Sequence, residues 1–329
     1  IELLYDIIET LKQQNIAVLF ISHKFHEVFK MADRVTVLRD GQYISTDLIE
    51  DINEDLLVQK MVGRSILFEP LNEQSEARDE YVLEVKNLSR KGHFTDVSLA
   101  LKKGEVLGMT GLVGAGRSEF AQSVFGLNPP DSGEVIIEGE TTVFRHPSEA
   151  IAKGIAYLPE NRKTEGLVLS QPISRNVTIP ILKRIRRKQL LDLKRERKLG
   201  EKYIADLDIR PPDPDRLTGE LSGGNQQKVV IGKWLATEPK ILIVDEPTNG
   251  VDIGAKVAIH KLLRQLAADG LGIILISSEL PEVLTVSDRI LVMRQGQVVA
   301  ELDATETNQE EILQYALEER HPEQRREAR

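Results

Sequence analysis

The chain contains an internal repeat, and this repeat limits its domain organisation more than any other feature. Residues 21–42 return as residues 276–297, at a constant offset of 255 residues and without a gap. Ten of the 22 aligned positions are identical. Similarity at a fixed spacing is typical of a duplicated structural unit. The sequence therefore predicts the last part of one domain, followed by nearly all of a second, related domain.

Both copies of the repeat predict the same elements in the same order. These are a helix, a buried strand, a short helix, a second strand and a glycine turn. The strands and turns fall at 17–21, 34–38 and Gly41 in the first copy, and at 272–276, 289–293 and Gly296 in the second.

The repeat and the composition shifts predict the domain boundaries. Residues 1–63 are the C-terminal remnant of the first domain, and the charged, weakly periodic stretch 64–80 is a linker. The second domain covers 81–318, with a polar helical insertion at about 170–235, and residues 319–329 form a frayed tail.

The second domain alternates apolar strands with helices, which predicts an α/β fold with a mainly parallel sheet. The expected strands are 81–85, 96–101, 105–109, 134–137, 241–244 and 272–276, and the expected helices include 118–125 and a continuous stretch at 174–207.

Composition limits the class of protein. The sequence has no cysteine, which agrees with a reducing compartment, and a net charge of −9, which argues against a mainly nucleic-acid-binding protein. No apolar run approaches the ~18–20 residues of a membrane span, and the N-terminus does not resemble a signal peptide. The chain begins at Ile1 within a helical pattern, so we expect that the true start of the gene product is missing.

The segment Gly111–Ser118 fits the pattern of a phosphate-binding loop between a strand and a helix. Glycines let successive backbone N–H groups turn inward as an anion site at a helix N-terminus. Ser118 would place its hydroxyl on Mg²⁺, and Arg117 replaces the usual lysine with a planar fork. A dinucleotide fingerprint is excluded because no third glycine follows. Alone, the loop is also compatible with a glycine-rich turn that binds nothing.

Two adjacent acids, Asp245 and Glu246, follow the apolar run Ile241–Val244. Sheets of this class place ligands at the carboxyl ends of their strands. Asp245 would hold Mg²⁺ through water, and Glu246 would polarise the attacking water. The alternative is a strand that ends in solvated acids.

A third motif, Leu221–Lys228, opens a helix with Ser-Gly-Gly. Ser222 is a candidate N-cap, and the two glycines permit a second anion-binding helix terminus. With the phosphate loop before it and the acids after it, this motif resembles the signature of ABC ATPases. In that family, the signature of one domain caps the γ-phosphate held by the loop of its partner, so two domains pair head to tail around two ATP molecules.

The resemblance assigns further residues by position. Asp252 matches the D-loop, Glu160 stands where the Q-loop glutamine belongs, and Ser278 stands at the switch histidine, whose counterpart in the first copy is His23. Phe94 is a candidate for the aromatic that stacks on adenine. The resemblance implies ATP contacts from Gly111, Gly114, Ala115, Gly116, Arg117, Ser118, Glu119, Glu160, Ser222, Gly223, Gly224, Gln226 and Asp252, metal contacts from Ser118, Asp245 and Glu160, and catalytic roles for Glu246, His23 and Ser278.

The motif variants look like the second domain of fused sugar-importer ATPases of the ribose, galactoside, xylose and arabinose type. That resemblance implies ATP and Mg²⁺ as cofactors, and an ATPase at the cytoplasmic face of the bacterial inner membrane. It implies partners as well: membrane permease subunits that contact the groove near Glu160, and indirectly a periplasmic sugar-binding protein. Because Ser278 replaces the histidine, the site with Arg117 would hydrolyse ATP slowly and the site with His23 faster. A fragment with half of each site would turn ATP over weakly.

Two other functions remain open at this point. A soluble twin-ABC ATPase acting on ribosomes or DNA usually carries a long charged linker, a coiled coil or zinc-binding cysteines, and a non-catalytic nucleotide-responsive module would not need Glu246. No nucleic acid is expected as a partner. The basic stretch 183–198 is compatible with nucleic acid, permease or lipid headgroups, but also with a solvated helical face.

Overall fold

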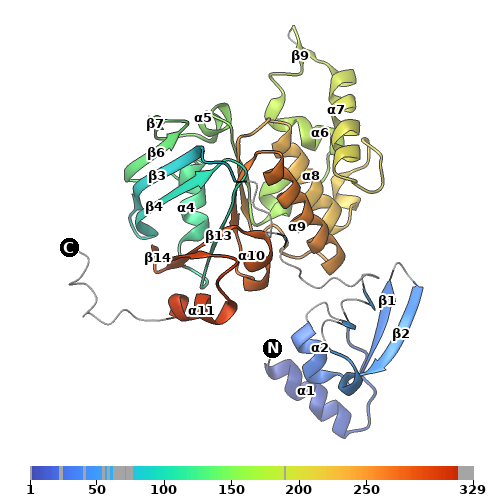
Figure 1. The fold of residues 1–329 in the computed structure, drawn as a ribbon. Coiled ribbons are helices and arrows are strands. Elements are labelled where there is room, and N and C mark those ends of the chain that lie inside the picture. Colours follow the sequence, from blue (N-terminus) through green and yellow to red (C-terminus); the bar gives the residue numbers. More distant parts are fainter. Residues whose placement is uncertain are drawn as a thin grey trace, which may run out of the picture. The chain divides into compact units, whose positions relative to one another are not determined.

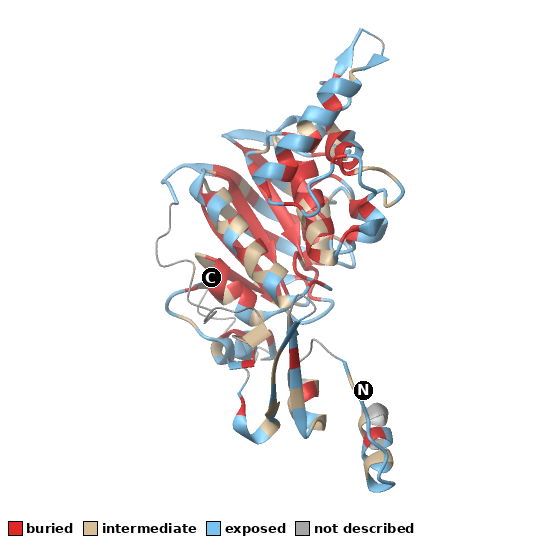
Figure 2. Cartoon of the chain, turned by 90° about the vertical axis from the view of Figure 1, so that its right-hand side faces the viewer, coloured by how far each residue is buried: buried red, intermediate tan, exposed pale blue. Residues whose placement is uncertain are grey.

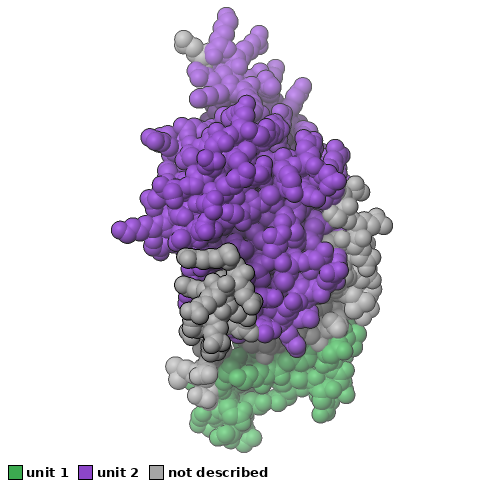
Figure 3. Space-filling model, turned by 60° about the vertical axis from the view of Figure 1, so that its left-hand side comes forward, with its two compact units in different colours: residues 1–69, 252–254 green, residues 70–251, 255–329 purple. Residues whose placement is uncertain are grey.

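The structure is a computed structural model that describes residues 2–21, 25–39, 42–53, 56–57, 60–61, 71, 77–188 and 190–317. The chain divides into two compact units, residues 1–69 with 252–254 and residues 70–251 with 255–329 (Figure 3).

The larger unit is built around a six-stranded sheet with the order β14–β13–β5–β12–β11–β8. Its strands are β5 (Val106–Gly111), β8 (Ile155–Leu158), β11 (Ile241–Asp245), β12 (Gly272–Ile276), β13 (Arg289–Arg294) and β14 (Gln297–Asp303). All neighbouring pairs are parallel except β13 with β14. Every residue of β8, β11 and β12 is buried, which explains their continuous apolar runs (Figure 2). The predicted α/β fold with a mainly parallel sheet is confirmed.

A second, antiparallel sheet packs on the same core. It has the order β4–β3–β6–β7, with β3 (Tyr81–Arg90), β4 (Phe94–Lys102), β6 (Ser132–Ile137) and β7 (Glu140–Thr142). Its buried residues, apart from Ile136, belong to the same apolar cluster as the central strands. A Cβ atom at Gly272 would lie 2.8 Å from a methyl carbon of Val82 and 2.9 Å from one of Leu101. The absence of a side chain at this position lets β12 approach the second sheet.

Five helices complete this part of the unit: α4 (Arg117–Val124), α5 (Pro147–Ala152), α9 (Ile253–Ala268), α10 (Leu280–Val286) and α11 (Gln309–Leu317). A separate group of helices holds α6 (Ile173–Thr178), α7 (Leu193–Asp206) and α8 (Gly223–Leu235), together with short turns of 3₁₀ helix at Ile179–Ile181 and Thr218–Glu220. A five-residue π-helical turn spans Arg162–Gly166.

The prediction of one continuous helix over 174–207 is wrong in its middle. The strands β9 (Arg186–Arg187) and β10 (Leu190–Leu191) form a short antiparallel hairpin there (Figure 1). Helix α7 then begins anew, because the side chain of Asp192 accepts a hydrogen bond from the Arg195 N–H at 3.1 Å as its N-cap. The basic stretch therefore lies on a hairpin and a helix start rather than along one helical face.

The smaller unit contains α1 (Glu2–Gln13), α2 (Phe25–Met31), β1 (Arg34–Arg39), β2 (Gln42–Leu48) and a short 3₁₀ turn, Ile49–Asp51. The strand predicted at 17–21 is not formed, and Leu19 and Ile21 are 91% and 90% exposed. Its counterpart β12 is a strand because β5 and β11 bond to both of its edges. No described strand pairs with 17–21, and a strand without a partner is not stable in water.

The repeat in the sequence is also a repeat of backbone structure. Strands β1 and β2 pair with the same antiparallel register as β13 and β14, since Arg34 faces Leu48 and Arg289 faces Asp303. Both hairpins carry a bulge at the corresponding place, between residues 37 and 38 and between 292 and 293. Bulges are specific features of a family rather than accidents of one chain. The shared bulge therefore supports a common origin of the two segments.

Candidate active site

The loop Gly111–Ser118 connects β5 to α4 and is held in a form that only glycine adopts easily. Gly114 and Gly116 have φ angles of 81° and 94°. A Cβ atom at Gly116 would lie 2.7 Å from the His93 carbonyl oxygen. The Ala115 carbonyl accepts a hydrogen bond from the Gly296 N–H at 3.0 Å, which ties the loop to the β13–β14 turn.

The N-terminus of α4 is open to an anion. Gly116 is its N-cap and offers no side chain, so no side-chain group caps the first turn. The first N–H groups of a helix have no partners within it, and the helix dipole favours negative charge there. The loop and this helix start together have the character of a phosphate site.

Asp245 ends β11 at the same edge of the sheet. Its side chain is 1% exposed, and Oδ2 accepts a hydrogen bond from the Tyr157 hydroxyl at 3.0 Å. Burial raises the pKa of Asp245, while the nearby hydroxyls of Ser118 and Tyr157 partly offset that rise. Burial also raises the pKa of Tyr157, which keeps its hydroxyl a neutral donor.

A magnesium ion fits this arrangement. Asp245 Oδ1 is buried and has no hydrogen-bond partner among the residues that the structure describes. The hydroxyl of Ser118 approaches the same carboxyl group closely enough to lower its pKa. In residues 77–188 and 190–317 no cluster of three or more His, Cys, Asp or Glu side chains could enclose a metal. A site with few protein oxygens suits Mg²⁺, which takes its other ligands from water and substrate phosphates.

Glu246 follows Asp245 directly and turns its carboxyl group toward the end of β12. Its backbone adopts a φ of 46°, uncommon for a non-glycine residue and a sign of a constrained site. Oε1 accepts a hydrogen bond from the Ser278 N–H at 2.8 Å and lies 3.9 Å from Arg117 Nη1. Burial raises the pKa of Glu246 to about 7, against the lowering effects of Ser278 and Arg117. A carboxylate with this pKa is suited to accept a proton near neutral pH.

Arg117 is directed into the site rather than into solvent. It is 8% exposed, and its Nη1 donates to the Ser277 carbonyl oxygen at 2.8 Å. The same carbonyl accepts a hydrogen bond from the Thr110 hydroxyl at 2.9 Å. Guanidinium groups suit buried contacts of this kind because they are weakly hydrated and donate in a fixed plane. Arg117, Glu246 and the end of β12 therefore form one connected group.

The segments around Glu160 and Gly250 meet next to β11. Asn249 Nδ2 donates to Glu160 Oε1 at 3.3 Å. Arg162 Nη2 donates to the Gly250 carbonyl oxygen at 2.8 Å, which joins the two loops. Glu160 and Asp252 are both exposed. His23 lies outside the described residues.

The Ser222 motif opens α8 as an N-cap. Ser222 Oγ accepts a hydrogen bond from the Asn225 backbone N–H at 3.5 Å and another from the Asn225 side chain at 3.0 Å. A Cβ atom at Gly223 would lie 2.8 Å from Arg162 Nη2, so this terminus packs against the loops just described. Gln226 is 4% exposed, and its Nε2 donates to the Thr218 carbonyl oxygen at 3.1 Å, which is a structural contact.

The structure thus brings one group of the predicted site residues together and leaves a second group away from them. Gly111, Gly114, Ala115, Gly116, Arg117, Ser118, Glu119, Asp245, Glu246 and Ser278 belong to the loop, its helix and the strand ends beside it. No hydrogen bond between described residues joins Ser222, Gly223, Gly224 or Gln226 to this loop.

Two residues near the site correct or extend the sequence interpretation. Phe94 is 2% exposed and packs edge-on against Phe120, with ring centroids 5.7 Å apart, so its proposed stacking on adenine is wrong. The role of Tyr157 was missed. Tyr157 lies in the apolar strand β8 (Ile155–Leu158), where the sequence gives no sign of a special role. Its hydroxyl reaches Asp245 only because β8 pairs with β11 in the folded sheet.

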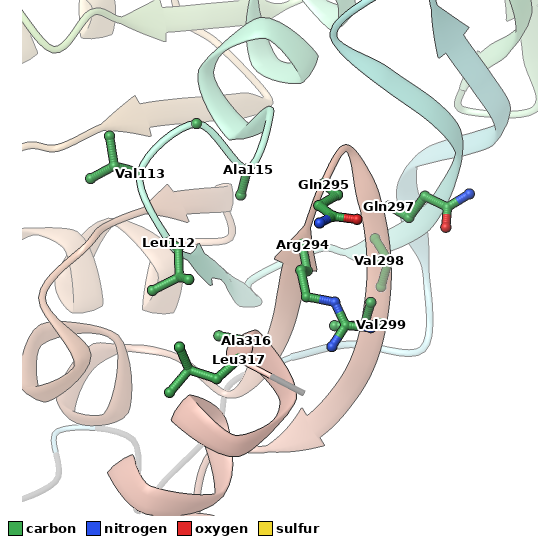
Figure 4. A pocket seen from close by; sticks show the side chains of 11 residues that line it. Leu112, Val113, Ala115, Arg294, Gln295, Gln297, Val298, Val299, Ala316 and Leu317 are labelled. Atoms are coloured by element: carbon green, nitrogen blue, oxygen red, sulfur yellow. The ribbon is translucent and has the colours of Figure 1, made fainter. Parts of the chain in front are cut away.

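A pocket of about 560 Å³ lies beside the first half of the loop (Figure 4). Leu112 and Val113 line it from the loop, Arg294 and Gln297 from the β13–β14 hairpin, and Leu317 from the end of α11. Asp245 and Glu246 do not line this pocket. The acids therefore lie outside this pocket, and Glu246 is next to Arg117 at the start of α4.

Comparison with known proteins agrees with this geometry. Residues 94–249 match the family model described as ABC transporter. The ribose import ATP-binding protein RbsA of Roseobacter denitrificans is 47% identical over 318 residues, which are 96% of this chain and 62% of that protein. A putative ribose/galactose/methyl galactoside import ATP-binding protein of Burkholderia cenocepacia is 48% identical over 314 residues, 95% of this chain and 61% of that protein. The chain thus spans about three fifths of these relatives.

Solved structures lead to the same conclusion. A nucleotide-free ATP-binding cassette from an ABC transporter superposes with a TM-score of 0.61 and 25% identity, over 73% of this chain and all of that one. The ADP conformation of the ATP-binding cassette MJ1267 gives a TM-score of 0.59 and 27% identity, over 72% of this chain and 94% of that one. The fold is therefore that of an ATP-binding cassette, and residues 94–249 match the ABC transporter family model.

Proposed function

We propose that this chain is part of the ATP-binding subunit of a bacterial ABC importer for a monosaccharide. In this proposal the larger unit binds MgATP, and hydrolysis is coupled to a membrane permease. One observation supports it above all. The unpaired oxygen of Asp245, the Ser118 hydroxyl and the open start of α4 converge at the end of the glycine loop, next to a carboxyl group with a pKa near 7.

Each group has a distinct task in the proposed reaction. The loop N–H groups and the start of α4 bind the phosphates, and Arg117 adds positive charge beside them. Ser118 and Asp245 would hold magnesium, with Glu160 as a further oxygen ligand, and the ion would neutralise phosphate charge. Glu246 accepts a proton from the attacking water, and the Ser278 N–H fixes the direction of its carboxyl group.

The two composite sites of the whole protein are unequal in this proposal. Ser278 contributes its backbone N–H to Glu246, but its side chain cannot supply the charged hydrogen bond of a histidine. Such a bond is worth ~1.5–3 kcal/mol, or about 10–100-fold in rate. The site with Arg117 is therefore the slow one. The other site would combine His23 with Ser222, Gly223 and Gly224 from across a head-to-tail pair of domains.

The domain assignment follows the repeat. Residues 1–63 would be the end of a first ABC domain, 64–80 a linker, 81–318 the second domain and 319–329 a tail. The shared register and bulge of the two hairpins support the common origin of the two domains.

The partners follow from the relatives, whose names describe import. Permease subunits would contact the exposed surface near Glu160, and a periplasmic sugar-binding protein would act indirectly. The protein would then work at the cytoplasmic face of the inner membrane. None of the described helices is long and apolar enough to cross a membrane.

Two alternatives have less support. A soluble twin-ABC ATPase acting on ribosomes or DNA does not agree with relatives that are named for sugar import. A non-catalytic nucleotide-responsive module would leave no reason for a largely buried Glu246 side chain with a pKa near neutrality.

A titration with MgATP tests the proposal directly. We expect saturable binding by the chain, which falls at least about tenfold in Asp245→Asn when magnesium is present, because the metal loses a charged ligand. Without magnesium the two proteins should bind ATP alike. Glu138→Gln, which changes an exposed acid paired with Lys240 far along the sheet, is the matched control. Absence of MgATP uptake by the unaltered chain would refute the proposal.

A further inference from the structure

One peptide group contacts both charged side chains of the candidate active site. The carbonyl oxygen of the Ser277–Ser278 peptide accepts from Arg117 Nη1 at 2.8 Å, and its N–H donates to Glu246 Oε1 at 2.8 Å. A peptide group is planar, so its C=O and N–H turn together. A rotation of this one group would break both contacts at once.

Three buried side chains hold this peptide group in place. Ser277 Oγ donates to Glu282 Oε2 at 2.5 Å, and Glu282 Oε1 lies 2.7 Å from His260 Nε2. Ser277 is fully buried, and Glu282 and His260 are each 1% exposed. We refer to Ser277, Glu282 and His260 as the buried cluster. It joins the end of β12 to α10 and α9 behind the active site.

The buried cluster is electrostatically satisfied. Burial raises the pKa of Glu282. The His260 contact, the Ser277 hydroxyl and the charge of Lys256 together lower it by more, so the pKa of Glu282 lies below its usual value. Glu282 is therefore an ionised carboxylate with a partner on each oxygen. A buried charge with both oxygens paired is costly to disturb. Ser277 Oγ also accepts the Glu279 N–H at 3.0 Å, which leaves its hydroxyl a single orientation.

The proposed mechanism uses Arg117 and Glu246 but gives the buried cluster no task. None of its members lines the pocket beside the loop. If the buried cluster served only stability, it would not need to end on the one peptide group that both Arg117 and Glu246 contact. Its position is therefore informative about function.

We propose that the buried cluster is a positioning unit: it fixes the Ser277–Ser278 peptide group, and through it places Arg117 beside the phosphates and Glu246 beside the attacking water. This inference rests on the proposed function, because it assigns Arg117 to bound nucleotide. His260 and Glu282 act only through Ser277, so they are positioning residues and not catalytic ones.

The substitution Ser277→Ala tests the inference with the smallest change in shape. It removes the hydroxyl that links the peptide group to Glu282. We expect the dissociation constant for MgATP to rise about tenfold, because Arg117 is then no longer held in place to donate a charged hydrogen bond to the phosphates. Ser123→Ala is the matched control, since Ser123 is likewise buried and loses one hydrogen bond, to the Asn128 carbonyl at 2.6 Å. The control should change the dissociation constant less than twofold.

A double-mutant cycle separates positioning from loss of stability. In an Arg117→Ala background, Ser277→Ala should change MgATP binding less than twofold, because its effect is transmitted through Arg117. Glu282→Gln, which keeps the shape and can still bond to both neighbours, should stay within threefold of the unaltered chain. If Ser277→Ala does not fold, Ser277→Cys, with its weaker donor, takes its place in the cycle.

The outcomes distinguish the two proposals. If the unaltered chain does not bind MgATP, the proposed function fails. If it binds MgATP, and Ser277→Ala either matches Ser123→Ala or weakens binding equally with and without Arg117, the positioning role is overturned.

Discussion

At the scale of single residues, the most informative group is Glu246. Its carboxyl is largely buried, beside Arg117 and the Ser278 N–H, and burial raises its pKa to about 7. The sequence alone identified this residue from its place after an apolar strand. It did not predict the pKa, because the burial depends on neighbours that are far away in the chain.

The raised pKa predicts a pH dependence of stability. The folded state holds a proton on Glu246 up to about pH 7, whereas the unfolded chain releases it near pH 4.5. Stability from this group is therefore fully present below pH 4.5 and is lost as the pH rises through 7, by about 3 kcal/mol. Urea unfolding of the native chain and Glu246→Gln at pH 5 and pH 8 measures this, since only the native chain should lose that stability. Parallel pH curves for the two proteins would contradict it.

A second prediction concerns the switch position. Ser278→His in the full two-domain protein should raise single-turnover hydrolysis at the Arg117 site about 10–100-fold, because it restores a charged hydrogen bond worth ~1.5–3 kcal/mol. Ser278→Ala, which keeps the N–H bond to Glu246, should leave the slow rate nearly unchanged. Rapid-quench measurement with less ATP than enzyme separates this step from product release. Equal rates for the histidine and alanine variants would argue against a degenerate site.

At the scale of elements, sequence patterns succeeded where each element is determined locally or by strong apolar runs. Strands β5, β11 and β12 were expected from such runs, and the start of α4 from its glycines. The patterns failed where contacts with distant parts of the chain determine which element forms. Residues 17–21 have the apolar character of a strand but no described neighbour, and the polar stretch after α6 forms a hairpin instead of helix. The buried cluster was not predicted either, since His260 and Glu282 meet only through the packing of α9 against α10.

The glycine loop gives a prediction at this scale. Gly116→Ala forces a side chain into a φ of 94° and places its Cβ 2.7 Å from the His93 carbonyl oxygen. We expect MgATP binding to fall more than about tenfold, because the loop must shift away from its phosphate-binding form. Gly92→Ala is a matched control, with a φ of 80° but nothing within 4 Å of the added carbon. Calorimetric titration of both variants with MgATP measures their affinities, and equal affinities would contradict the prediction.

At the scale of the whole molecule, the chain covers about 62% of its RbsA relative from Roseobacter denitrificans. The motif at Ser222 contacts Arg162 and its surroundings rather than its own glycine loop. Each complete site in the proposal needs a signature from a partner domain, and such composite sites cannot be assembled from one cassette.

Steady-state ATPase measurements test this composite arrangement. We expect the present chain to hydrolyse ATP at least about tenfold more slowly than the full two-domain protein, because stabilisation of the transition state by the missing half of each site is lost. Both proteins should be compared at several concentrations, since self-association of the chain would raise its rate. A concentration-independent rate equal to that of the full protein would refute the arrangement.

The bulges at 37–38 and 292–293 have a consequence for the history of this protein. An extra residue inserted independently in two hairpins would rarely fall at the same step of the ladder. In the proposed two-domain arrangement, the kink is therefore older than the duplication: an ancestor with a single domain already bent this hairpin there, and both copies have kept that bend.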